Sequence, residues 1–275
     1  MPDVTPSPVT RIGIAGWGRM GAAMGAHFLS RGLHVAGYDP DPAAAEDIVR
    51  SGAARAESPA DLGRRSELVL VIVVDDDQVR SVVNGPAGIV AGSEPGTIVA
   101  ICATVRPATA IEVATEAAAH GVDVVDMGLV GGERAAASAS LRIMCGGSEE
   151  VIDACREVLA AVASDVCRIG GIGTGQVAKT ANNILLWACI RADLEVLRLA
   201  KALGVPPNTL RSFMAIGSGA NRPLAEWGLH TPRWPKKDLE IALDIAGEAG
   251  IDMPFIAALA PLMDEITPEV LHEMK

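Results

Sequence analysis

The stretch RIGIAGWGRMG, residues 11–21, decides the fold because it joins a short apolar strand to three spaced glycines. In a G-x-G-x-x-G turn, Gly16 makes the tight bend, Gly18 lets the backbone approach a pyrophosphate, and Gly21 permits close packing of helix on strand. A helical segment follows, and a second apolar strand ends in Asp39, 18 residues after Gly21. This context predicts a dinucleotide-binding β–α–β unit, with the pyrophosphate at the start of the helix.

Asp39 also predicts which dinucleotide binds. A carboxylate at the end of the second strand accepts hydrogen bonds from the hydroxyls of an adenosine ribose. Facing a 2′-phosphate, the same carboxylate would cost on the order of 4 kcal/mol per charge pair at 4 Å. Residues 40–49 supply no basic side chain before Arg50. The sequence therefore favours NAD over NADP.

Apolar runs of strand length alternate with segments of helix length in the first part of the chain. Six such runs are RIGIAG (11–16), HVAGYD (34–39), LVLVIVV (68–74), TIVAIC (97–102), VDVVDM (122–127) and LRIMCGG (141–147). Between them lie Ala-rich segments such as Ala22–Ser30 and Ala108–Ala119. Continuous apolar strands separated by helices predict a parallel sheet covered on both faces, which is a doubly wound α/β fold of the Rossmann type.

After about residue 170 the strand pattern stops. Residues 175–204 are typical of one long helix that ends at Gly204, with prolines just beyond. Further helices are predicted around 206–215, 236–249 and 253–266. We therefore predict a flexible tail (1–10), an NAD-binding Rossmann domain (11–170), and an all-helical substrate and oligomerisation domain (171–275) that the long interdomain helix opens.

Composition excludes several other classes of protein. The formal net charge of −11 disfavours a nucleic-acid partner. Apolar runs such as Leu68–Val74 are seven residues long, far below the roughly 20 needed to span a bilayer. The five cysteines and five histidines lack the spacing of a disulfide frame or a metal site. These features predict a cytoplasmic protein without membrane segments or a bound metal.

The stretch GTGQVAKTANN, residues 173–183, carries the predicted catalytic group. Residues four apart on a helix differ by about 40° in azimuth and 6 Å in height, so Lys179 and Asn183 share a face. A solvated helix face is the simpler interpretation of such a pair. If the helix begins where the two domains meet, however, a desolvated Lys179 serves as general acid and base for a hydroxyl/carbonyl pair, and Asn183 orients it.

Four ordered motifs, together covering nearly the whole chain, resemble those of the β-hydroxyacid dehydrogenase family. They are GIAGWGRMGAAM (13–24) for the cofactor, DMGLVGGERAAASASLRIMCGG (126–147) for the substrate, GTGQVAKTANN (173–183) for catalysis and KKDLEIAL (236–243) for the cofactor. The family pattern for the substrate motif is D-A-P-V-S-G-G with a later L-x-x-M-x-G-G. The catalytic pattern is G-x-G-x-x-x-K-x-x-N-N.

The resemblance implies an NAD-dependent oxidoreductase that moves a hydride between nicotinamide and a hydroxy acid or aldehyde. It implies that Lys179 is the acid/base with Asn183 as its partner, and that the substrate contacts residues 130–132 and these two side chains. Eleven residues are expected to contact the cofactor, on the basis of the glycine motif, the acid at the strand end and the resemblance. They are Gly16, Trp17, Gly18, Arg19, Met20, Gly21, Asp39, Val73, Val74, Thr104 and Lys237. Trp234, just before the K-D-L motif, either lines the substrate pocket or packs.

Several positions depart from the family pattern, two of them in the substrate motif. Val130 replaces the serine before Gly131 and Gly132, and Gly128 replaces the proline two positions earlier. Ala103 replaces a serine before Thr104. The backbone N–H groups of Gly131 and Gly132 remain able to bind a carboxylate, but the serine hydroxyl is lost. We therefore expect a substrate that is larger or less polar than 3-hydroxyisobutyrate.

Three alternatives stand beside this interpretation. A 6-phosphogluconate dehydrogenase would carry a histidine where this chain has Asn182, and a longer helical part. An imine reductase of the same architecture generally lacks the lysine and uses NADPH. A non-catalytic NAD-binding interaction module would lose the lysine, which is retained. Because the helical part has more apolar residues than about 105 residues bury alone, we also expect a homodimer or homotetramer.

Overall fold

The computed structural model describes residues 9–229 and 232–274, which form two compact units. Most of the expected N-terminal tail, residues 1–8, lies outside the described residues. The units comprise residues 1–179 and 180–275, and they divide within one long helix. The last strand of the sheet ends at residue 170, where the first domain was predicted to end.

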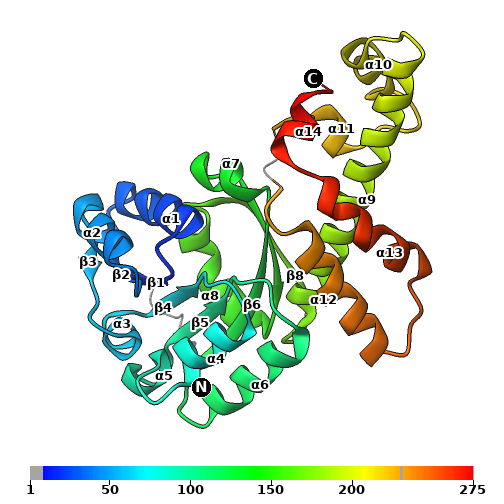
Figure 1. Ribbon diagram of the computed structural model, residues 1–275. Coiled ribbons are helices and arrows are strands. Elements are labelled where there is room, and N and C mark those ends of the chain that lie inside the picture. Colours follow the sequence, from blue (N-terminus) through cyan, green and yellow to red (C-terminus); the bar gives the residue numbers. More distant parts are fainter. Residues whose placement is uncertain (1–8, 230–231, 275) are drawn as a thin grey trace. The chain divides into compact units, whose positions relative to one another are not determined.

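The first unit is built on a sheet that has eight strands within the described residues, in the order β3-β2-β1-β4-β5-β6-β7-β8 (Figure 1). The strands are β1 (Arg11–Ala15), β2 (His34–Tyr38), β3 (Ala54–Arg55), β4 (Leu68–Val71), β5 (Ile98–Ile101), β6 (Asp123–Val130), β7 (Leu141–Gly146) and β8 (Ala163–Gly170). The strand order reverses between β1 and β4, and ligands of open α/β sheets bind at the carboxyl ends of the strands at such a point. The predicted Rossmann-like fold is confirmed.

Helices cover both faces of this sheet. They are α1 (Arg19–Ser30), α2 (Pro42–Ser51), α3 (Pro59–Arg65), α4 (Asp76–Asn84), α5 (Ile89–Gly92), α6 (Pro107–Ala118), α7 (Gly132–Ala137), α8 (Glu149–Leu159) and the start of α9 (Thr174–Ala202). One buried cluster joins α1 and α8 to one face of the sheet, and a second joins α4 and α6 to the other. Alternate residues of β4 enter the two clusters, as expected for a strand buried on both faces.

The sheet is parallel, as predicted, except at β7, which pairs with β6 in the antiparallel direction. Only residues 131–140 separate the two strands, and a parallel return needs a crossover of a dozen or more residues. β3 and β8 were not predicted, because the two residues of β3 and the polar sequence ASDVCRIG of β8 lack an apolar strand pattern. The apolar run 68–74 forms a strand only through Val71.

The second unit is helical, as predicted. After α9 come α10 (Pro207–Met214), α11 (Arg222–Ala225), α12 (Pro235–Glu248), α13 (Pro254–Leu259), the 3₁₀ segment η1 (Ala260–Glu265) and α14 (Pro268–His272). Its core packs apolar residues of α9 against α11, α12 and the C-terminal helices. The buried Trp227 ring donates its Nε1–H to the Leu271 carbonyl at 2.9 Å and so ties the C-terminal segment to this core. Among the described helices, none combines the length and apolar character that crossing a bilayer requires.

Candidate active site

The glycine loop between β1 and α1 has the shape of a pyrophosphate site. Gly16 has a φ of +96°, and a Cβ there would collide with the Ile72 carbonyl oxygen at the end of β4. A Cβ on Gly21 would likewise collide with the Gly16 carbonyl, whereas the space beside Gly18 is open. No side chain of the described residues caps the start of α1. The first N–H groups of this helix therefore remain directed at an anion, as a dinucleotide phosphate requires.

Asp39 is held in one orientation at the end of β2. Its Oδ2 accepts a hydrogen bond from the Trp17 backbone N–H at 2.8 Å, and its Oδ1 accepts one from the Asp41 N–H at 2.9 Å. Each carboxylate oxygen keeps a further lone pair for the hydroxyls of a ribose. The carboxylate thus links the glycine loop to the predicted ribose site.

Three other predicted cofactor residues have their side chains engaged elsewhere. The Trp17 ring is buried against Gly25 of α1 and Gly37 of β2, where a Cβ would strike it. Met20 packs partly buried against the core, and Arg19 forms an exposed ion pair with Glu133 at 3.4 Å. These residues have only their backbone directed into the loop.

A buried amide positions the loop that contains Thr104. The Gln176 side chain is fully buried; its Nε2 donates to the Ala103 carbonyl at 3.0 Å, and its Oε1 accepts from the Val105 N–H at 3.0 Å. The Gln176 amide therefore hydrogen-bonds to the backbone on both sides of half-buried Thr104. Val73 and Val74, also predicted to contact the cofactor, follow β4 at the same edge of the sheet.

The start of α9 is fixed by Asp126 of β6. This fully buried carboxylate accepts hydrogen bonds from the N–H groups of Gly173 at 2.6 Å and Gln176 at 2.7 Å. Burial raises the pKa of the Asp126 carboxyl to about 6, against the opposing effect of these two N–H groups. A negative carboxylate near the N-terminus of α9 also interacts favourably with the helix dipole.

Lys179 lies one turn after this anchor. Its half-buried side chain extends along β6, and Nζ donates to the Leu129 carbonyl at 2.7 Å. A Cβ at Gly128 would lie 2.9 Å from the Lys179 Cβ and 3.0 Å from the Gly175 carbonyl oxygen. Gly128, which stands where the family has proline, thus lets α9 approach β6 closely. The ammonium lies beside the peptide that precedes Val130.

The predicted substrate residues follow β6 immediately. Val130 is half-buried, and Gly131 and Gly132 are exposed with φ values of +111° and +65°. Lys179 and residues 130–132 thus come together within the first unit, although they are far apart in the chain.

The remaining predicted residues belong to the second unit. Asn183 is buried, and its Oδ1 accepts from Asn182 Nδ2 at 3.3 Å. At the start of α12, Lys237 Nζ lies 6.0 Å from the centroid of the Trp234 ring, which is 55% exposed. The next residue, Asp238, accepts from Trp187 Nε1 on α9 at 2.9 Å. This contact ties the start of α12 to the helix that carries Asn183.

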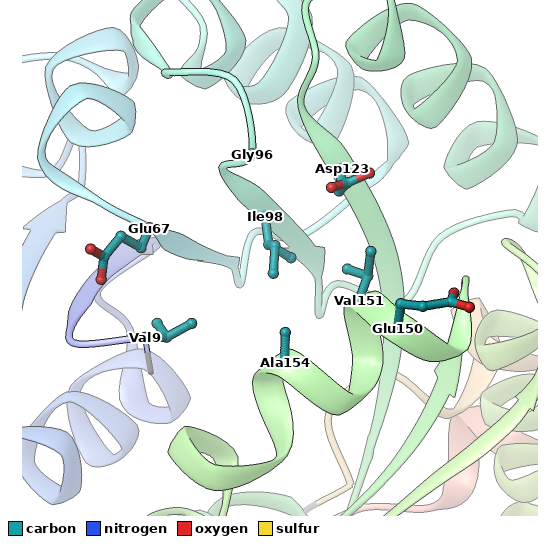
Figure 2. A pocket seen from close by; sticks show the side chains of 8 residues that line it. All are labelled: Val9, Glu67, Gly96, Ile98, Asp123, Glu150, Val151 and Ala154. Atoms are coloured by element: carbon teal, nitrogen blue, oxygen red, sulfur yellow. The ribbon is translucent and has the colours of Figure 1, made fainter. Parts of the chain in front are cut away.

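A cavity of about 410 Å³ lies at the opposite edge of the sheet (Figure 2). It is lined by Val9, Glu67, Gly96, Ile98, Asp123, Glu150, Val151 and Ala154, which lie at the amino ends of β1, β4, β5 and β6 and on α8. Its three carboxylates would repel the phosphates of a dinucleotide. The cofactor therefore fits the carboxyl edge, where the glycine loop lies.

Comparison with known protein families agrees with this geometry. Residues 11–171 match the family described as the NAD binding domain of 6-phosphogluconate dehydrogenase. Residues 173–274 match the family described as NAD-binding of NADP-dependent 3-hydroxyisobutyrate dehydrogenase. The chain is a member of the β-hydroxyacid dehydrogenase family. It is therefore an NAD(P)-dependent dehydrogenase that acts on hydroxyl groups.

Individual relatives of this β-hydroxyacid dehydrogenase support the assignment along its length. It is 27% identical to 2-(hydroxymethyl)glutarate dehydrogenase of Eubacterium barkeri, over 92% of this chain and 88% of that protein. It is 32% identical to L-threonate dehydrogenase of Cupriavidus necator, over 90% of this chain and 87% of that protein. The structure of Mycobacterium tuberculosis 3-hydroxyisobutyrate dehydrogenase with L-serine superposes with a TM-score of 0.84, covering 97% and 99% of the two chains at 26% identity.

Sequence reasoning missed two residues that shape the site of this dehydrogenase. Asp126 and Gln176 were quoted within motifs, but neither was assigned a role. A carboxylate within the apolar run VDVVDM was the available signal, because a charge in a buried strand needs partners. For Gln176 no local signal exists, since its partners lie 71 and 73 residues away.

Proposed function

We propose that this dehydrogenase uses NAD to oxidise a hydroxy acid, or to reduce the corresponding aldehyde or ketone, with Lys179 as general acid and base. The observation that carries the proposal is the placement of the Lys179 ammonium beside residues 129–132. Its 2.7 Å bond to the Leu129 carbonyl holds the amine at the point where the substrate motif leaves the sheet. The names of the relatives, which describe 3-hydroxyisobutyrate, L-threonate and 2-(hydroxymethyl)glutarate dehydrogenases, support a hydroxy acid as substrate.

The residues divide the reaction between them. Gly131 and Gly132 bind the substrate carboxylate through their backbone, and Lys179 takes the proton from the substrate hydroxyl. NAD held at the glycine loop and Asp39 would supply the hydride acceptor for the carbon that carries this hydroxyl. Asn183, four residues along α9, orients the amine and the substrate oxygen. In reduction, Lys179 returns the proton to the carbonyl oxygen.

The choice of NAD over NADP follows from Asp39. Its carboxylate is fixed by the N–H groups of Trp17 and Asp41 and is half-exposed at the end of β2. This orientation suits the paired hydroxyls of a ribose and opposes a 2′-phosphate. Lys237 is proposed to reach the nicotinamide end, as the family resemblance implies, and the exposed Trp234 ring to border the substrate.

The apolar Val130 favours a substrate larger or less polar than 3-hydroxyisobutyrate. A serine hydroxyl at this position would donate to the substrate carboxylate, and the valine side chain instead offers contact to carbon atoms. A steady-state panel of hydroxy acids with NAD and NADP tests both proposals. The highest specificity constant for small 3-hydroxy acids would contradict the substrate proposal, and equal use of NADP would contradict the cofactor proposal.

The catalytic role of Lys179 has a direct test. We expect Lys179→Ala to lower kcat by roughly 10²- to 10⁴-fold, the usual contribution of general acid–base catalysis, while NAD binding is retained. Added methylamine should partly restore turnover, because a free amine replaces the lost base. Lys201→Ala, an exposed lysine in the last turn of the same helix, is the matched control. Near-wild-type turnover by a folded Lys179→Ala would disprove the assignment.

We further propose that the protein is a cytoplasmic homodimer or homotetramer formed through its helical part. Exposed apolar side chains near the ends of α9 and α10 support this. Leu203 directly after α9, Phe213 of α10 and Ile216 two residues after α10 are 74%, 75% and 82% exposed. Exposed apolar surface of this kind marks interaction sites. All five cysteines are free thiols, which agrees with a reducing compartment. Sedimentation of the purified protein as a monomer at micromolar concentration would contradict the oligomer.

A further inference from the structure

Arg142 lies on β7 directly beside Val130 of β6. The two residues are paired in the antiparallel register of these strands. Cα atoms of such a pair are about 4.5–5.5 Å apart, and the paired side chains point to the same face of the sheet. Because β7 enters the sheet where β6 leaves it, Arg142 lies at the carboxyl edge, next to residues 130–132.

The shared face of Val130 and Arg142 is the one opposite the α1–α8 core. Leu129 and Ile143, their neighbours along the two strands, belong to the core cluster that includes α1 and α8 residues. Successive side chains of a strand alternate between faces. Val130 and Arg142 therefore point away from that core.

Lys179 lies on the same face, one residue pair further along. A Cβ at Gly128 would lie 2.9 Å from the Lys179 Cβ and 3.5 Å from Met144 Cε, and Gly128 pairs with Met144. Two residues along a strand span about 6.6 Å, which is the distance from Gly128 to Val130. The Val130–Arg142 pair therefore lies about one such step from the base of the Lys179 side chain. The ammonium and the guanidinium thus stand on one surface, with Val130 beside them.

The Arg142 side chain is exposed and, within residues 9–229 and 232–274, has neither an ion pair nor a hydrogen bond. Arg168 on the neighbouring strand, by contrast, donates to the Gly147 carbonyl at 3.0 Å. The charged residue in register with Arg142 on β8 is Asp165, and no ion pair joins the two. A guanidinium left in this state has its paired donors available for a carboxylate or phosphate.

We infer that Arg142 recognises a second anionic group, a carboxylate or a phosphate, at the far end of the hydroxy acid. This inference rests on the proposed function, in which Gly131 and Gly132 hold the first carboxylate and Lys179 the hydroxyl. Val130 contacts the methylene groups between the two ends. Of the two properties expected from Val130, a larger substrate is thereby favoured over a less polar one.

Steady-state kinetics test the inference with substrates of matched length. 3-Hydroxyadipate ends in a carboxylate, 3-hydroxy-5-phosphonopentanoate in a phosphonate, and 3-hydroxyhexanoate in a methyl group. We expect the wild type to prefer one of the first two. Arg142→Gln should raise the KM for that substrate roughly 10- to 100-fold, the loss typical of a charged hydrogen bond, with little change in kcat. The KM for 3-hydroxyhexanoate and for NAD should change less than about threefold, within the effect of a neutral surface substitution.

Two further variants sharpen the result. Arg31→Gln removes another exposed arginine, just beyond the last turn of α1 at the other edge of the sheet, and should leave all three substrates unaffected. Asp165→Asn should lower the KM for the anionic substrate a few-fold, because a competing negative charge is removed. In an Arg142→Gln background the Asp165→Asn effect should shrink, since the guanidinium it competes for is gone.

Equilibrium binding separates this inference from the proposed function. Calorimetry on the NADH-loaded protein compares adipate and 5-phosphonopentanoate with hexanoate, which match the three substrates in length, and needs no turnover. Tighter binding of a dianion, lost in Arg142→Gln, supports the inference even if none of the hydroxy acids is oxidised. Equal binding of hexanoate and both dianions, or a preference that survives Arg142→Gln, overturns it even if hydroxy acids are oxidised. A raised KM for NAD alone would also overturn it, by assigning Arg142 to the cofactor.

Discussion

The glycine loop and the β6–α9 region both belong to the first unit, but different contacts stabilise each of them. In the loop, backbone meets backbone: the Gly16 N–H donates to the Tyr38 carbonyl at 2.9 Å, and glycines allow the close approaches. In the β6–α9 region, two fully buried side chains, Asp126 and Gln176, make the connections. The close approaches of the glycine loop therefore depend on the absence of side chains, whereas the β6–α9 region depends on particular side chains.

Of the substitutions that compare these two regions, Asp126→Asn should produce the largest change in kcat, because Asp126 holds the start of α9. Asp126→Asn keeps one acceptor oxygen but turns an amide nitrogen towards a backbone N–H, leaving a buried donor unsatisfied. That loss is worth about 1–3 kcal/mol. If the cost falls on the placement of Lys179, kcat drops roughly 5- to 100-fold. NAD affinity should change little, because the glycine loop is not involved.

The pH dependence of stability gives Asp126 a second readout. Its folded-state pKa of about 6 lies above the ordinary value of 3.8, so the folded protein binds this proton more tightly than the unfolded chain does. The stability that Asp126 contributes is thus greatest at low pH and is lost as the pH rises through about 6. In urea unfolding, the wild type should lose stability relative to Asp126→Asn between about pH 4 and 6, the range between the unfolded and folded pKa values. Asp123→Asn, at the exposed start of β6, serves as control; an identical pH profile for both variants would contradict the role of Asp126.

A smaller effect is expected beside the glycine loop, where Asp39, directly after β2, accepts a hydrogen bond from the Trp17 N–H. Asp39→Asn keeps an acceptor for the Trp17 N–H and removes the charge. We expect the ratio of kcat/KM for NAD to that for NADP to fall about tenfold, equivalent to about 1.4 kcal/mol of lost discrimination against the 2′-phosphate. Asp41→Asn, two residues along at the start of α2, should leave this ratio unchanged. An unaltered ratio in Asp39→Asn would transfer cofactor choice to another residue.

The same contrast explains which features the sequence predicted. The glycine loop lies within eleven consecutive residues, so spacing alone identifies it. The contacts of Asp126 with Gly173 and Gln176 span 47 and 50 residues, and no local pattern announces them. The antiparallel β7 was predictable from the short connection of residues 131–140, yet its apolar pattern alone does not distinguish direction. Because that direction was misassigned, the pairing of Arg142 with Val130 also escaped sequence reasoning.

The smallest effect should come from restoring the family serine. Val130→Ser places a hydroxyl beside Gly131, where it can donate to the carboxylate of a small substrate. A neutral hydrogen bond of this kind contributes about 0.5–1.5 kcal/mol, so kcat/KM for 3-hydroxyisobutyrate should rise about threefold. Val130→Thr is the matched control, because it adds the hydroxyl and retains the branched shape of valine. A gain with both variants would assign the effect to the hydroxyl, a gain with serine alone would assign it to lost bulk, and no gain would show that Val130 is not what excludes small substrates.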